Sequence, residues 1–228
     1  MALKIIFMGT PKFSVPILDS IHQSNHKIIE VYTQPPTKKN RGQKVHLSPV
    51  HTFSKKNNIP VRHPNQIDTN EELEHIDKLK ADVVIVAAYG KILPRSLLNL
   101  KNLKFINIHA SLLPKWRGSA PIHRAIMNSD RETGISIMKI VPKLDSGPVM
   151  MSSKIKIHKD TNYEILSNQL SKMGSELIIK SLKLLENNEE KFIKQNEKES
   201  TYAKKISKEE SQINWNETAS QIIAKINA

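Results

Sequence analysis

The chain has 228 residues, a formal net charge of +13 and no cysteine. At roughly 150 residues per domain it forms one or two domains, and without cysteine it has no disulfide, thiolate metal site or cysteine nucleophile. Its longest apolar run, Val83–Ala88, is much shorter than the about 20 residues that cross a bilayer, and Met1–Gly9 lacks the pattern of a secretory signal, so we expect a cytoplasmic protein without a membrane anchor.

Apolar runs alternate with helical patterns up to about residue 186. Strands are predicted at 3–8, 27–33, 60–62, 82–88, 105–109, 135–141 and 149–158, and helices at 15–23, 49–57, 70–79, 120–127 and 162–186. Residues 35–48 are expected to form a loop, and either Thr69 or Asn70 to cap the helix that follows. This alternation predicts an α/β fold with a doubly wound, mostly parallel, Rossmann-like sheet.

The sequence changes character after Glu186. Residues 187–211 are dense in Lys, Glu, Asn and Ser and are interpreted as a linker, and 217–228 as a short amphipathic tail. We therefore divide the chain into a catalytic domain at 1–188 and a C-terminal segment at 189–228. No G-x-G-x-x-G follows the first strand and no P-loop pattern is present, so we expect neither a dinucleotide cofactor nor a P-loop.

Two polar side chains occupy one face of the predicted strand 105–109. Residues alternate between the faces of a strand, so Asn107 and His109 lie together, opposite Ile106 and Ile108. Ligands of open α/β sheets bind beyond the carboxyl ends of strands. An amide can stabilise an oxyanion and an imidazole can accept a proton, so the pair fits acyl-transfer chemistry. The alternative is a polar strand end bonded to the next loop.

Asp145 is a third candidate, in a turn between two predicted strands. A carboxylate near His109 would orient the imidazole ring. The alternative is that Asp145-Ser-Gly is an ordinary turn. Nearby, Trp116 is either a core residue or a stacking surface, and Arg117 either a solvated charge or an anion contact.

A basic stretch follows the second predicted strand. No Asp or Glu occurs in 31–67, while Lys38, Lys39, Arg41 and Lys44 lie within a connection that is long for an α/β protein. Such a field attracts phosphate groups. A flexible solvated loop, or a genome that favours lysine codons, is the alternative.

Taken together, these motifs resemble the folate-dependent formyltransferase family, and within it the branch that acts on methionyl-tRNA. The matching segments are Ile5–Phe13, Tyr32–Pro35, Ala87–Pro94, Asn107–Ile122, Thr133–Ile137, Leu144–Pro148 and Tyr202–Ile206. The N-x-H-x-S-L-L-P pattern with a downstream aspartate is specific to the family as a whole. The Met-Gly-Thr-Pro start and the Trp-Arg-Gly run point to the tRNA branch.

The resemblance implies a formyltransferase fold, the donor 10-formyltetrahydrofolate and no metal. It implies that Asn107, His109 and Asp145 are catalytic. It also implies that Ser111, Leu112, Leu113 and Pro114 border the folate site, and that the basic loop with Lys38, Lys39, Arg41 and Lys44 contacts tRNA. The protein would be a monomer that formylates the initiator methionyl-tRNA.

Two departures from the family pattern stand out. The loop contains Gln34-Pro-Pro-Thr-Lys38 where the family usually has Gln-Pro-Asp-Arg-Pro, so its individual tRNA contacts are expected to differ. The chain ends at Ala228, where the family's C-terminal barrel domain begins, so we expect 189–228 to be the linker and the start of a truncated domain. Whether that domain was removed or is not encoded stays open.

Two other functions remain as alternatives. A formyltransferase acting on a small amine, such as glycinamide ribonucleotide or an amino sugar, would share Asn107, His109 and Asp145 but would not need the basic loop. A non-catalytic RNA-binding remnant would explain the positive charge, but all three catalytic residue types are still present.

Overall fold

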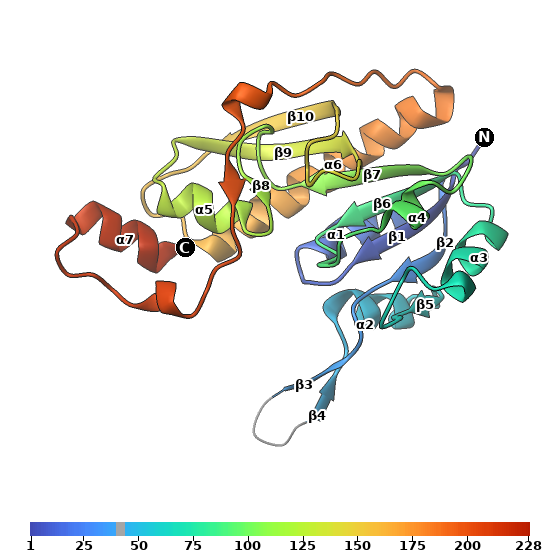
Figure 1. Cartoon of the computed structure of the whole chain (residues 1–228), viewed down its shortest axis with the longest axis horizontal. Helices are drawn as coiled ribbons and strands as arrows, with labels where there is room; N and C mark the ends of the chain where they lie inside the picture. Colours follow the sequence, from blue (N-terminus) through green and yellow to red (C-terminus); the bar gives the residue numbers. More distant parts are fainter. Residues whose placement is uncertain (40–43) are drawn as a thin grey trace.

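The computed structural model describes residues 1–39 and 44–228, with strand residues 38–39 and 44–45 described by their backbone alone (Figure 1). Its centre is a seven-stranded sheet in the order β10-β9-β7-β6-β1-β2-β5. The strands are β1 (Lys4–Gly9), β2 (Lys27–Tyr32), β5 (Val61–Arg62), β6 (Val83–Ala87), β7 (Lys104–His109), β9 (Glu132–Lys139) and β10 (Val149–Lys156).

Strand direction confirms the prediction of a mostly parallel sheet. β1 pairs in parallel with β2 and β6, β6 with β7, and β2 with β5. β9 is antiparallel to both of its neighbours, β7 and β10. The parallel strands therefore end along one edge, and β7, the last of them, lies beside an antiparallel strand.

Helices cover both faces of the sheet, as in a doubly wound fold (Figure 1). The helices are α1 (Ser14–His22), α2 (Pro49–Lys56), α3 (Asn70–Lys78), α4 (Arg95–Leu98), α5 (Pro121–Met127), α6 (Tyr163–Asn187) and α7 (Ala219–Asn227). Thr69 caps α3, because its hydroxyl accepts a hydrogen bond from the amide of Glu72. None of these described helices is both long and apolar enough to cross a bilayer.

The core has two parts because side chains alternate along the strands. Ile5 and Phe7 of β1 pack with α1, α5 and α6 in the larger cluster. Ile6 and Met8 face the other way and pack with α3 and α4 in the smaller one. Both clusters are buried, so β1 is apolar from Ile5 to Met8, as expected for a central parallel strand.

The expectation of a loop at 35–48 is wrong. Thr37–Lys39 (β3) pairs antiparallel with Lys44–His46 (β4), and this hairpin projects from the body below β2 (Figure 1). Both strands are three residues long and rich in lysine, so they lack the apolar alternation that predicts a strand.

The segment after α6 returns across the sheet instead of leaving it (Figure 1). Tyr202–Ala203 (β11) pairs in parallel with Arg117–Gly118 (β8), and Ala203 is buried. Two short 3-10 helices, Glu197–Glu199 (η1) and Glu209–Ser211 (η2), flank β11, and α7 contacts α5. Much of the expected linker is therefore attached to residues of the first 188.

Candidate active site

β7 places Asn107 and His109 on one face, as predicted. Ile106 and Ile108 point into the larger core under α1 and α6, which leaves the opposite face for the two polar side chains. His109 is buried and Asn107 is half-buried. Packing of the apolar face thus fixes the direction of the polar pair.

The loop between β9 and β10 brings Asp145 to this pair. Asp145 Oδ2 lies 3.7 Å from His109 Nδ1, and Asp145 Oδ1 lies 3.5 Å from Asn107 Nδ2. The amide of Gly118 donates to Asp145 Oδ2 at 2.9 Å, so the carboxylate has a fixed direction. The three candidates, distant in sequence, converge in one place.

The backbone carbonyl of Trp116 determines which nitrogen of the His109 ring carries the hydrogen. His109 Nε2 lies 2.8 Å from the carbonyl oxygen of Trp116, and a carbonyl can only accept, so Nε2 carries the hydrogen. In the neutral ring, Nδ1 then presents its lone pair to Asp145 Oδ2, which explains why those two atoms stay apart. The sequence interpretation, in which Asp145 orients the ring, is incomplete, because a backbone carbonyl holds the other nitrogen.

The backbone around the site adopts unusual conformations. Trp116 has a φ of +59° and Asp145 a φ of +43°, in the left-handed region that L-residues other than Asn and Asp rarely adopt. Gly147 closes the same loop, where an added Cβ would clash with the backbone oxygen of Lys139. Strained backbone of this kind often occurs at functional sites, where the surrounding structure holds it.

The segment Ser111–Pro114 follows β7 directly. The Ser111 side chain is fully buried and donates to the carbonyl of Lys115 at 2.6 Å, while its own carbonyl accepts from the hydroxyl of Ser136 at 2.8 Å. Leu112, Leu113 and Pro114 are partly exposed and give apolar surface next to His109.

Arg117 is not a solvated charge, and the anionic group that it contacts is a carboxylate of this chain. Its side chain is fully buried and pairs with Glu197 at 2.9 Å, in the segment after α6. Hydrogen bonds from Arg117 and Lys143 lower the pKa of Glu197 to about 2. Trp116 is half-buried, and its indole nitrogen donates to Asp130 at 2.6 Å.

Three of the four basic residues of the predicted tRNA loop belong to the hairpin. Lys38 and Lys39 lie on β3 and Lys44 on β4. Arg41 lies outside the described residues. In the described part of the chain, no group of three or more His, Cys, Asp or Glu residues could hold a metal ion.

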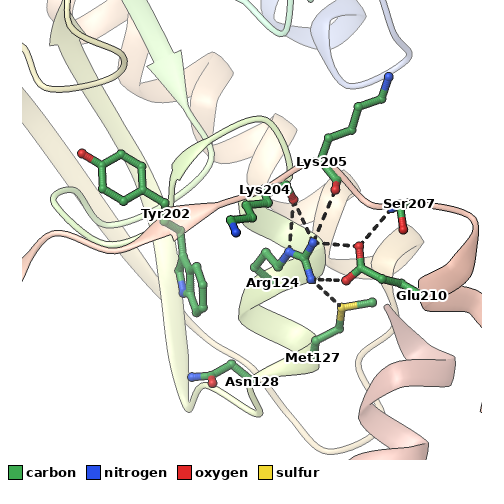
Figure 2. A pocket seen from close by; sticks show the side chains of 9 residues that line it. Arg124, Met127, Asn128, Tyr202, Lys204, Lys205, Ser207 and Glu210 are labelled. Carbon is green, nitrogen blue, oxygen red and sulfur yellow. Dashed lines mark hydrogen bonds and ion pairs between the residues drawn. The ribbon is translucent and has the colours of Figure 1, made fainter. Parts of the chain in front are cut away.

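A hollow of about 640 Å³ lies beside the site, between α5 and the strand β11 (Figure 2). Trp116 and Tyr202 line it, and Arg124 closes one end by donating to the carbonyl of Lys204 and pairing with Glu210. None of the three catalytic candidates lines this hollow. Sequence reasoning missed these contacts, because they join α5 to a stretch that resembles an ordinary polar linker.

The chain is similar in sequence to known formyl transferases. A family model described as formyl transferase matches residues 3–182. The methionyl-tRNA formyltransferase of Pelagibacter ubique (strain HTCC1062) is 51% identical over 228 residues, which is 100% of this chain and 74% of that protein. The methionyl-tRNA formyltransferase of Coxiella burnetii (strain CbuK_Q154) is 44% identical over 100% of this chain and 73% of its own.

Solved structures of more distant proteins share the fold. An N-formyltransferase from Helicobacter canadensis, solved with folinic acid and dTDP-3-aminofucose, has a TM-score of 0.75 at 22% identity, covering 100% of this chain and 80% of its own. A 4-N formyltransferase from Francisella tularensis has a TM-score of 0.75 at 19% identity, covering 99% and 87%. At this identity the likeness concerns the arrangement of the sheet and helices alone.

Proposed function

Because the chain belongs to the formyl transferase family, we propose that it transfers the formyl group of 10-formyltetrahydrofolate to the α-amine of methionyl-tRNA. The observation that carries this proposal is the convergence of Asn107, His109 and Asp145 on one face of β7. Similarity over the whole chain to enzymes named methionyl-tRNA formyltransferase supports the choice of acceptor.

The residues beside β7 fit a folate donor. Leu112, Leu113 and Pro114 offer partly exposed apolar surface for a flat ring system, directly after His109. The donor, when bound, supplies a formyl group attached to nitrogen. Ser111 precedes this surface and supports it from within, since its hydroxyl is bonded to Lys115 and its carbonyl to Ser136.

Each catalytic residue then has one role. Asn107 Nδ2 donates a hydrogen bond to the formyl oxygen as negative charge develops on it. The methionyl amine, neutral above its usual pKa of about 7.7–8.0, forms a bond to the formyl carbon, and His109 takes up the released proton at Nδ1. Asp145 Oδ2, 3.7 Å away, stabilises the charged ring. The carbon–nitrogen bond of the donor breaks, and the proton passes to the departing nitrogen.

Replacing Asn107 tests the proposal directly. We expect Asn107→Ala to lower the single-turnover rate of formyl transfer to methionyl-tRNA by about 10²–10³-fold, the usual loss for one oxyanion donor. Asn65→Ala, at an exposed position away from β7, is the matched control. A rate within twofold of wild type would remove Asn107 from the mechanism.

The acceptor is tested in the same assay. Wild-type protein is supplied with the formyl donor and with methionyl-tRNA, glycinamide ribonucleotide or a nucleotide-linked amino sugar. We expect formylation of methionyl-tRNA alone. Transfer only to a small amine would overturn the choice of acceptor while leaving the catalytic residues in place, and no transfer at all would favour a non-catalytic role.

We propose a catalytic domain at 1–188 followed by a linker and the start of a further domain at 189–228. We expect a monomer that acts in the cytoplasm, on the initiator form of methionyl-tRNA. The hairpin lysines Lys38, Lys39 and Lys44 are proposed to contact the tRNA backbone.

A further inference from the structure

Gln195 contacts the catalytic loop from outside the sheet. It lies in the polar segment after α6, and its Nε2 donates to two backbone carbonyls, Asp145 O at 2.9 Å and Gly147 O at 2.6 Å. Both hydrogens of the amide are therefore used on the loop that carries Asp145. No other side chain among the described residues donates to these two oxygens.

Arg117 determines which end of this amide faces the loop. Gln195 Oε1 accepts from Arg117 Nε at 3.0 Å and from Nη2 at 2.8 Å. A guanidinium can only donate, so the oxygen must face Arg117 and the nitrogen must face the loop. Arg117 is fully buried and its other side-chain hydrogen bonds go to Glu197, so its own direction is fixed.

The loop turns sharply at Asp145 and packs closely at Gly147. Asp145 has a φ of +43°, and Gly147 lies against the backbone oxygen of Lys139. A bridge between Val149 and Ile193 brings the segment with Gln195 alongside the loop. Removing the Gln195 amide would leave the two carbonyls without this donor and allow the turn to move.

We propose that Gln195 is a positioning residue, whose carboxamide, oriented by Arg117, holds the Asp145 turn so that the carboxylate faces His109 and Asn107. The functional part of this inference rests on the proposed formyl transfer. It assigns a role in the reaction to the segment after α6, which lies beyond the residues that the family model matches.

Two variants separate the bonds to the loop from the bonds to Arg117. Gln195→Ala removes both. Gln195→Glu keeps oxygens that accept from Arg117 but has no hydrogen to donate to the carbonyls. We expect both to lower kcat by tenfold to about 10²-fold, the scale of a displaced catalytic group, while KM for methionyl-tRNA changes less than twofold. Gln169→Ala, exposed on α6, is the control and keeps wild-type kcat.

A double-mutant comparison with Asp145 distinguishes a positioning role of Gln195 from a general loss of stability. In an Asp145→Asn background, Gln195→Ala should cost less than a further twofold in kcat, because the group it positions is already altered. An equal loss in both backgrounds would overturn the proposal, as would wild-type kcat in both Gln195 variants.

A measurement that does not depend on formyl transfer tests the positioning role separately from the proposed function. The amide of Gly118 donates to Asp145 Oδ2, so its hydrogen exchange reports the position of that carboxylate. We expect Gln195→Ala and Gln195→Glu to speed exchange at Gly118 at least about tenfold, with Ile108 of β7 unchanged. Unchanged exchange at Gly118 would overturn the positioning role. Failure of the wild-type protein to formylate methionyl-tRNA would overturn the proposed function alone.

Discussion

Glu197 shows how one residue makes the stability of this fold depend on pH. Its carboxylate pairs with Arg117 at 2.9 Å and with Lys143 at 2.7 Å. These hydrogen bonds lower its pKa from 4.5 to about 2. Because the folded pKa lies below the unfolded one, the stabilisation is complete above about pH 4.5 and is lost as the pH falls through about 2.

Glu197→Gln should therefore be less stable than wild type at neutral pH, and the difference should vanish near about pH 2. Urea-unfolding midpoints measured across the acid range check this. The variant still loses some stability as the pH falls, because Arg124 also lowers the pKa of Glu210 to about 2. Glu176→Gln, exposed on α6, is the control for removing one negative charge. An acid slope equal to that of wild type would contradict the prediction.

Sequence reasoning placed the residues on β7 correctly, but it did not place the residues that contact the Asp145 loop from the segment after α6. Asn107 and His109 share a face because strand periodicity is local, so their direction can be predicted without the fold. Arg117 could not be placed in this way. Its burial depends on Gln195 and Glu197, which lie far along the chain in a segment of surface-like composition.

At the scale of elements, α6 depends on a capping residue at its start. Asn162 Oδ1 accepts a hydrogen bond from the amide of Ile165 at 2.9 Å. We expect Asn162→Ala to cost about 0.5–2 kcal/mol of unfolding free energy, because an N-terminal amide of the helix loses its acceptor. For a protein of this size each kcal/mol lowers Tm by about 2–4 °C in a calorimetric scan.

A second asparagine on the same helix provides the control for the cap. Asn168 is exposed within α6, where alanine is the better helix former, so Asn168→Ala should leave Tm unchanged or slightly raised. Equal losses in the two variants would show that removing an asparagine, and not the cap, is responsible.

The long elements and the two-residue strand β5 were predicted from the sequence, whereas β8 and β11 were not. α6 and the central strands have patterns that extend over several residues, and their predicted bounds agree with the structure within a few positions. β8 and β11 contain two residues each and exist only because they pair with one another. Their local sequence carries no strand pattern, because Arg117–Gly118 and Tyr202–Ala203 lie among polar residues.

At the scale of the whole molecule, the positive charge is unevenly placed. The acid-free stretch 31–67 contains the hairpin β3–β4, which projects from one side of the body (Figure 1). α6 also carries exposed lysines, but it packs along β9 and β10. If only the net charge mattered, removing the same number of lysines from the hairpin or from α6 would weaken nucleic-acid binding equally. Variants of the two regions with equal total charge can therefore be compared.

Neutralising the hairpin lysines tests whether its position matters. We expect Lys38, Lys39 and Lys44 changed together to Gln to weaken binding of methionyl-tRNA and to flatten the plot of log Kd against log salt by about 0.7–0.9 for each phosphate group that the hairpin no longer neutralises. The control changes Lys172, Lys180 and Lys183 of α6 to Gln, which alters the net charge equally. If both triple variants flatten the slope alike, binding follows overall charge, and the hairpin does not itself bind the tRNA backbone.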